Sequence, residues 1–228
     1  ALEDSKGKKG HLFLTSEALQ KEAIHLLNAK IPVPSLRLHE QEVSDVLQDM
    51  ILHGEVVSVK GGIYLPRVFA QEDETARRIA MRVVEPPTPE KIEQILEQVK
   101  REMGLALSPK QEAAVYAAYR HNLSIITGSP GTGKTTVLKT ILEVYRRLHP
   151  QGEIALMAPT ARASRRMAES TGMNSSTIHK ACGLVPANNP SGFTAQGDCT
   201  ICGFIGIDEM SMVGEHLFAY AIDAVLSS

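Results

Sequence analysis

Apolar residues recur at helical spacing in the first quarter of the chain. The segment 15–28 begins with a Thr-Ser pair that suits a helix N-cap, and 39–53 carries its apolar residues on one face of a 3.6-residue helix. Gly54 ends the second of these predicted helices. Two β-rich runs within 55–66 then flank Gly61-Gly62, which predicts a β-hairpin.

Helices followed by a β-hairpin resemble a winged-helix module, which predicts a small α+β domain over 1–85. In one interpretation this domain contacts DNA through a helix or through Lys60 at the hairpin tip. In the other it packs against a partner, because fold alone does not determine function. The sequence leaves both interpretations open.

The pattern changes after residue 85. A proline-rich break at 86–89 precedes an amphipathic helix, so 86–104 is predicted to be a linker helix. Short apolar strands then alternate with helices through the segments 122–127, 135–148, 153–159 and 160–171. Such alternation predicts a parallel sheet covered by helices, and we therefore expect an α/β domain over 105–228.

A glycine-rich loop joins the first strand and the first helix of this alternation. Residues 128–136 read GSPGTGKTT and match the phosphate-binding pattern G-x-x-x-x-G-K-[ST] at every fixed position. Glycines let backbone N–H groups turn towards phosphates, while Lys134 neutralises their charge and Thr135 offers a hydroxyl to Mg²⁺. We therefore predict a P-loop NTPase fold with ATP and Mg²⁺ as cofactors. The candidate nucleotide-binding residues of the loop are Gly128, Ser129, Pro130, Gly131, Thr132, Gly133, Lys134, Thr135 and Thr136.

A hydrolytic site also needs carboxylates, and the apolar run 204–207 ends in two of them, Asp208 and Glu209. A buried strand there would bring Asp208 to the magnesium ion beside Thr135 and leave Glu209 to orient or deprotonate the attacking water. Lys134, Thr135, Asp208 and Glu209 are therefore the predicted catalytic residues. The simpler alternative is a strand that ends in two solvated acids.

Four segments resemble motifs of one helicase family in the same order. LSPKQEAAV (107–115) resembles the segment in which helicases carry a glutamine that reads adenine, and APTARASRRM (158–167) resembles motif Ia. STIHKACG (176–183) and IDEMSMV (207–213) resemble the Thr-Ile-His segment and motif II. Together they resemble the first motor domain of RecD-like, 5′-to-3′ superfamily 1 DNA helicases, the family of the exodeoxyribonuclease V α-subunit. The resemblance is specific over about 105–216 and weaker over 10–85.

This resemblance implies a RecA-like motor domain that couples ATP hydrolysis to translocation on single-stranded DNA, in recombination and repair. It also implies that Gln111 contacts adenine. Thr160, Arg162, Thr177 and His179 would line the path of the strand, and subunits of a helicase–nuclease complex would be partners. Superfamily 1 motors hold ATP between two such domains, and motifs III to VI are not in this sequence, so the fragment alone is expected not to unwind DNA.

Two other enzyme-like interpretations stay open. The chain also resembles the helicase domain at the end of conjugative relaxases. It could instead be an ATP-gated switch of the clamp-loader kind, which moves no strand and would be favoured if Gln111 contacted no adenine. A purely structural, degenerate domain does not suit the intact loop and carboxylates.

Charge and cysteine content bound the setting. The net charge is −2, from 24 basic and 26 acidic residues, so any DNA contact must come from a local surface. An odd count of cysteines, Cys182, Cys199 and Cys202, suits a reducing cytoplasm. The Cys199–Cys202 C-x-x-C pair would need two more ligands to hold zinc, and cysteines buried in a strand are the favoured interpretation. No apolar run is long enough to span a bilayer, so no membrane partner is expected.

Overall fold

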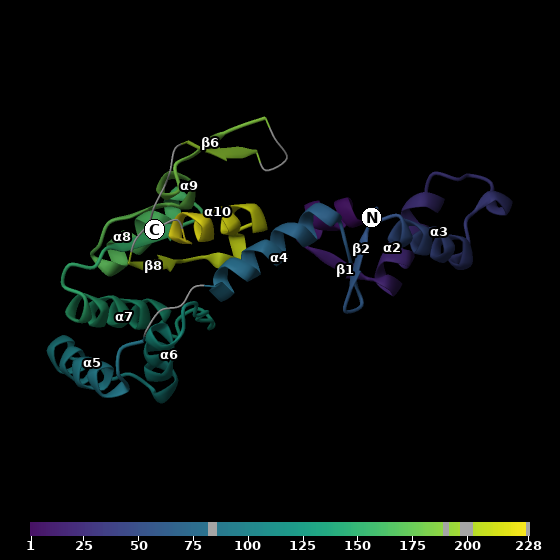
Figure 1. Cartoon of the computed structure of the whole chain (residues 1–228). Helices are drawn as coiled ribbons and strands as arrows, with labels where there is room; N and C mark the ends of the chain where they lie inside the picture. The colour runs from purple at the N-terminus through teal and green to yellow at the C-terminus, as the bar shows by residue number, and fades with distance from the viewer. Residues whose placement is uncertain (82–85, 189–191, 197–202, 227–228) are drawn as a thin grey trace. The chain divides into compact units, whose positions relative to one another are not determined.

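The structure, a computed structural model, describes residues 1–81, 86–188, 192–196 and 203–226. The chain divides into two compact units, Ala1–Glu74 and Thr75–Ser228, here called unit 1 and unit 2 (Figure 1). The helix α4 (Pro66–Met81) begins in unit 1 and ends in unit 2. Among the described residues, no helix combines the length and the apolar character needed to cross a membrane.

Unit 1 combines helices with one small antiparallel sheet of strand order β1-β3-β2. The predicted hairpin is confirmed: β2 and β3 pair antiparallel, and Lys60 and Gly61 turn between them with φ of 49° and 82°. A buried cluster of Leu19, Leu47, Val56 and Ile63 joins the helices to the sheet. The elements of unit 1 are α1 (Leu2–Lys9), β1 (Phe13–Thr15), α2 (Ser16–Asn28), η1 (Pro34–Leu36), α3 (Glu40–Leu52), β2 (Val57–Val59) and β3 (Gly62–Tyr64).

The helices of unit 1 start where the sequence supplies caps. The Thr15 hydroxyl accepts a hydrogen bond from the Ala18 N–H at 3.2 Å, and the Glu42 carboxylate accepts one from the His39 N–H at 2.8 Å. These caps satisfy backbone donors that α2 and α3 would otherwise leave unpaired. Helices with a β-hairpin are therefore present as predicted, while the winged-helix assignment and a DNA contact at Lys60 stay predictions.

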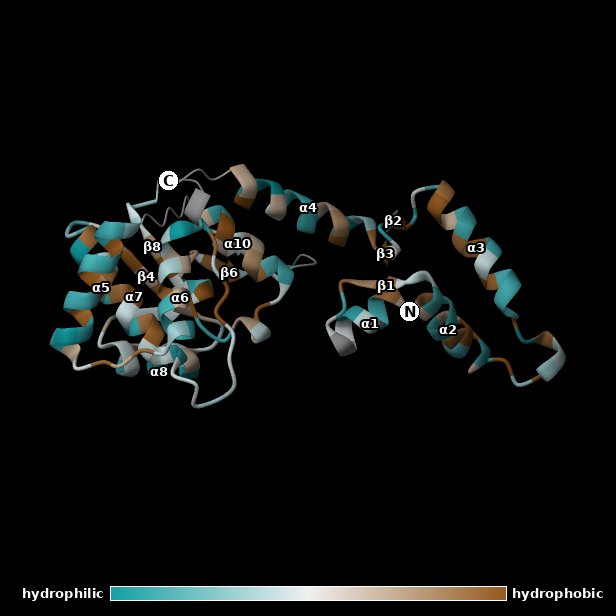
Figure 2. Ribbon diagram, turned by 90° about the horizontal axis from the view of Figure 1, so that it is seen from below, coloured by the Kyte–Doolittle hydropathy of each residue, from teal (hydrophilic) through white to brown (hydrophobic). Residues whose placement is uncertain are grey.

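Unit 2 is built around a parallel sheet of strand order β5-β4-β8, which confirms the predicted α/β fold. Helices α7 and α8 pack on one face through Leu142, Leu156 and Met167, while α9 and α10 pack on the other around Met157. The elements are α5 (Pro89–Met103), α6 (Pro109–Arg120), α7 (Lys134–Leu148), β4 (Ile154–Ala158), α8 (Ala161–Thr171), β5 (Ser175–Thr177), α9 (Ile178–Ala181), β6 (Leu184–Pro186), β7 (Phe193–Ala195), β8 (Phe204–Ile207), η2 (Met210–Met212) and α10 (Glu215–Leu226). Figure 2 shows the hydrophobic strands β4 and β8 enclosed by helices that carry both polar and apolar residues.

The segment 122–127, predicted as the strand before the glycine-rich loop, is not a strand in the structure. It pairs with none of the strands that the structure describes, and Ile125 is 80% exposed. A strand exists only through the partner that completes its hydrogen bonds, and the local apolar pattern does not supply that partner. The prediction of a strand here was wrong.

Helix α5, predicted as part of a linker, packs into the core of unit 2. Its residues Ile92, Leu96 and Val99 are at most 1% exposed and join a cluster with α6 and α7. Figure 1 shows α5 and α6 beside α7, on the side of α7 away from the strands. The domain bounds at 85 and 104 stay predictions.

The start of β8 requires a glycine, and its replacement tests the packing that carries Asp208. Gly203 has a φ of +88°, and a Cβ there would lie 2.2 Å from the Glu153 carbonyl oxygen. We expect Gly203→Ala to lower the free energy of unfolding by more than 2 kcal/mol, roughly the left-handed backbone cost plus a backbone clash. Urea denaturation measures it.

Gly172→Ala is the matched control for this substitution. Its φ is +71°, and nothing lies within 4 Å of the added Cβ, so only the backbone cost of about 1–2 kcal/mol is expected. Equal destabilisation by the two variants would show that the close approach of Gly203 to Glu153 contributes nothing.

Candidate nucleotide and strand site

The glycine-rich loop leads directly into α7. Gly131 and Gly133 have φ of 79° and 82°, and Gly133 is the N-cap residue of the helix. A glycine cap has no side chain to accept from the first turn, so the N–H groups there face outward together with the positive end of the helix dipole. The buried face of α7, including Val137, Ile141 and Val144, fixes this helix start against the core. The arrangement suits an anion such as a phosphate.

Hydrogen bonds within the loop hold its shape. The Ser129 carbonyl accepts from the Thr132 N–H at 3.3 Å, from the Thr132 hydroxyl at 2.8 Å and from the Lys134 ammonium at 3.1 Å. The Lys134 ammonium also donates to the Gly128 carbonyl at 2.6 Å. Lys134 is therefore folded across the loop while its side chain stays exposed to solvent and to any ligand.

Gln111 lies against this loop from the N-terminus of α6. Its side-chain Nε2 donates to the Thr132 carbonyl at 3.1 Å, and its Oε1 accepts from the Ser108 N–H at 2.8 Å. The sequence motif placed Gln111 near the nucleotide, and the structure brings it to the loop. The hydrogen bond from Gln111 to the Thr132 carbonyl could not be predicted, because every residue has a main-chain carbonyl and the sequence does not indicate which one a side chain will contact.

The two predicted carboxylates follow β8 at the same end of the sheet as the loop. Leu138 of α7 lies beside Gly206, and the ring of Tyr145 lies 5.3 Å from that of Phe204. Helix α7 therefore runs antiparallel to β8, which brings the start of α7 to the carboxyl end of the strand. Asp208 is the first residue after β8, and its N–H donates to the Met157 carbonyl at 3.0 Å. Open parallel sheets bind ligands at this edge.

Glu209 has an unusual backbone conformation. Its φ of 54° and ψ of 42° lie in the left-handed region that non-glycine residues rarely occupy. Its N–H donates to the Asp208 Oδ1 at 2.9 Å, so the two carboxylates are held on one short turn. Strained residues of this kind cluster at functional sites, where the surrounding structure holds them in place. Both side chains are exposed and accessible to a ligand.

The oxygen atoms at this edge fit a magnesium ion. Thr135 offers an exposed hydroxyl in the first turn of α7, and Asp208 has a second carboxylate oxygen besides the one bonded to Glu209. Within the described ranges, no group of three or more His, Cys, Asp or Glu side chains could form an all-protein metal site. Magnesium commonly binds through one carboxylate together with substrate phosphates and water, which this donor set allows.

The residues predicted to contact single-stranded DNA follow two neighbouring β-strands, β4 and β5. Thr160 caps α8, since its hydroxyl accepts from the Ala163 N–H at 3.2 Å, and Thr177 caps α9 through the Lys180 N–H at 3.2 Å. Arg162 is exposed in the first turn of α8. Ala158 pairs with Thr177 in the sheet, so the four predicted residues lie at or just after the carboxyl ends of two adjacent strands.

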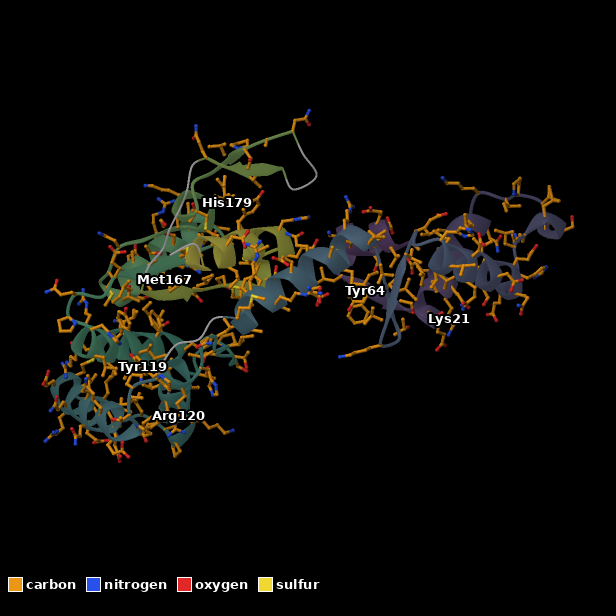
Figure 3. All side chains as sticks on the ribbon, in the orientation of Figure 1. Lys21, Tyr64, Tyr119, Arg120, Met167 and His179 are labelled. Atoms are coloured by element: carbon orange, nitrogen blue, oxygen red, sulfur yellow. The ribbon has the colours of Figure 1, made fainter. Side chains whose placement is uncertain are left out.

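His179 contacts the small sheet formed by β6 and β7. Its ring centroid lies 4.4 Å from that of Phe193, a residue that the motifs did not single out. Figure 3 labels His179, which lies in α9. The Phe193 carbonyl in turn accepts from the Tyr220 hydroxyl at 3.2 Å. Cys182, at the C-terminal end of α9, is buried. The Cys199–Cys202 pair lies outside the described residues.

One family match covers the loop, the carboxylates and the sheet together. The model of the AAA domain family matches residues 111–228, which is more than half of the chain. The chain belongs to the AAA domain family. Its match begins at Gln111 and includes every residue predicted for the nucleotide site.

Several curated relatives of this AAA domain protein are RecD2 or RecD proteins. The ATP-dependent RecD2 DNA helicase of Deinococcus radiodurans is 30% identical over 99% of the chain and 31% of its own length. RecBCD enzyme subunit RecD of Mycolicibacterium smegmatis is 29% identical over 51% of the chain and 25% of its length. RecD of Buchnera aphidicola subsp. Acyrthosiphon pisum is 26% identical over 89% and 36%. The resemblance to RecD-like helicases is confirmed, and the chain spans between a quarter and just over a third of these relatives.

Proposed function

We propose that the chain forms the nucleotide-hydrolysing part of a RecD-type, ATP-dependent DNA helicase that acts in recombination and repair. The observation that carries this proposal is the antiparallel packing of α7 on β8, which brings the loop and the carboxylates Asp208 and Glu209 to one sheet edge. The similarity to the ATP-dependent RecD2 DNA helicase of Deinococcus radiodurans supports the choice of DNA over other substrates.

The residues of the site divide the work of phosphoryl transfer. Loop N–H groups and Lys134 hold the phosphates of ATP, and Gln111 is the predicted contact for adenine. Thr135 and Asp208 would hold Mg²⁺, which supplies charge neutralisation at the phosphate oxygens when it is bound. Glu209 accepts a proton from the attacking water or orients it. Positioning and electrostatics, rather than covalent chemistry, then lower the barrier.

The proposed contact with single-stranded DNA lies at the carboxyl ends of the neighbouring β-strands, β4 and β5. Thr160 and Thr177 accept a backbone hydrogen bond as caps, and each hydroxyl still has a proton to donate to a DNA phosphate. Exposed Arg162 and the ring of His179 would add a cation and a stacking surface. Such contacts bind single-stranded DNA without reading its sequence. Subunits of a helicase–nuclease complex and a cytoplasmic location stay part of the proposal.

Nucleotide-dependent DNA binding tests this function. We expect the affinity of the protein for a fluorescein-labelled single-stranded oligonucleotide to differ at least fivefold between ADP and a non-hydrolysable ATP analogue, because coupled sites exchange about 1 kcal/mol or more. Fluorescence anisotropy measures both affinities.

Arg162→Ala should weaken binding in both nucleotide states by a similar factor, whereas Arg146→Ala on α7, the control, should change neither. An oligonucleotide affinity that is the same without nucleotide, with ADP and with the analogue would favour the ATP-gated switch that moves no strand.

A further inference from the structure

The side-chain amide of Gln111 is bonded to protein at both of its ends. Oε1 accepts from the Ser108 N–H at 2.8 Å as part of the capping box of α6, and Nε2 donates to the Thr132 carbonyl at 3.1 Å. The first bond fixes which end of the amide faces the loop, because Oε1 must face the Ser108 donor. Nε2 is therefore oriented as the donor to Thr132.

The Thr132 carbonyl determines the direction of a neighbouring N–H. In a planar trans peptide the C=O and the following N–H point in opposite directions. Gln111 holds the Thr132 carbonyl towards α6, so the Gly133 N–H points away from α6. The contact is close: a Cβ on Gly133 would lie 2.6 Å from the Gln111 Nε2. The Gly133 N–H is one of the donors that a phosphate-binding loop uses.

Helix α6 is a rigid support for this amide. Val115 is fully buried against α5 and α7, and the Tyr119 hydroxyl, labelled in Figure 3, donates to the Ile141 carbonyl of α7. Gln111 connects the first turn of α6 to the loop, and Tyr119 connects the last turn to the helix that follows the loop. Helix α6 therefore contacts the chain both before and after the point where the loop joins α7, at Thr132 and at Ile141.

We infer that Gln111 is a positioning residue of the phosphate loop, which holds the Thr132–Gly133 peptide so that the Gly133 N–H is directed at a bound phosphate whatever base the nucleotide carries. This inference rests on the proposed nucleotide site. It differs from the role implied by the helicase resemblance, in which Gln111 recognises adenine. A loop oriented before binding loses less freedom when the ligand binds, so its affinity is higher.

Inorganic tripolyphosphate separates the two roles, because it has phosphates but no base. Isothermal titration calorimetry of the whole chain with Mg²⁺ gives its affinity and that of ATP. Gln111→Met removes the Nε2 donor without adding charge, and Gln111→Glu removes it while keeping an acceptor for Ser108 at a position where glutamate suits the cap. We expect both variants to bind tripolyphosphate roughly fivefold to tenfold more weakly, the effect of one lost hydrogen bond.

Ser108→Ala is the matched control, since it removes the other half of the capping box and leaves the Nε2 contact in place. It should change the tripolyphosphate affinity less than twofold. Unchanged tripolyphosphate affinity in either Gln111 variant, or an equal loss in Ser108→Ala, overturns the inference. If only ATP binding weakens, Gln111 reads the base alone. If the unmodified chain binds neither ligand, the proposed nucleotide site itself fails.

Discussion

Lys134→Ala is expected to lower the rate of ATP hydrolysis by roughly 10³-fold or more, because it removes the ammonium group of the loop. This group lies across the loop and donates to the Gly128 and Ser129 carbonyls. Without this ammonium, the loop has no side-chain cation to balance the negative charge that develops on the phosphate oxygens, which is left to the backbone donors and to Mg²⁺. The same change should also weaken ATP binding, because the charge-assisted bonds to phosphate exist in the ground state too. Phosphate release under saturating ATP measures the rate.

Lys139→Ala is the matched control for this prediction. Lys139 is the same residue type on the same helix, five positions beyond the loop lysine. The control should retain the wild-type rate within about twofold, as surface substitutions away from a site usually do. A Lys134→Ala variant that hydrolyses ATP at the wild-type rate would mean that the glycine-rich loop is not the catalytic site.

Glu209→Gln is expected to separate binding from hydrolysis. The amide keeps the size of the side chain and leaves the Asp208 carboxylate in place, so the affinity for ATP should stay within a few-fold of wild type. Hydrolysis should fall about 10²- to 10⁴-fold, the usual contribution of a general base, because an amide cannot accept the proton of the attacking water. Single-turnover hydrolysis and equilibrium ATP binding give the two quantities.

A control variant shows whether the loss of hydrolysis is specific to Glu209. Glu169→Gln on the exposed side of α8 serves as the charge control and should leave both quantities unchanged. If Glu209→Gln hydrolyses ATP as fast as this control, Glu209 is one of the two solvated acids at the end of a strand, and another group activates the water. Loss of binding together with hydrolysis would instead assign Glu209 to holding the nucleotide.

The local geometry of the glycine-rich loop and of its helix could be predicted because each depends on short-range sequence. Gly131 and Gly133 adopt left-handed conformations that few other residues tolerate, and the apolar spacing after Lys134 specifies the amphipathic helix that presents the loop. Alternation of strands and helices sufficed for the parallel sheet, since crossover connections impose that order.

Features that depend on distant residues could not be predicted in the same way. The segment 122–127 has the apolar character of a strand, but a ladder partner from elsewhere decides whether it becomes one. Helix α5 reads as a linker because its own sequence does not reveal that α6 and α7 cover its apolar face. The cap roles of Thr160 and Thr177 were within reach of the sequence, since each precedes a helix.

The coupling of the nucleotide site to a DNA strand is the central claim, and one measurement tests it most directly. The steady-state ATPase rate of a form of the protein that includes a second motor domain is measured with and without a single-stranded oligonucleotide, beside Lys134→Ala in the same form. The account predicts a rate that rises at least tenfold with the strand, and no rise in the variant. A wild-type rate that the strand does not change would contradict the account, and would leave Thr160, Arg162, Thr177 and His179 without a role in DNA binding.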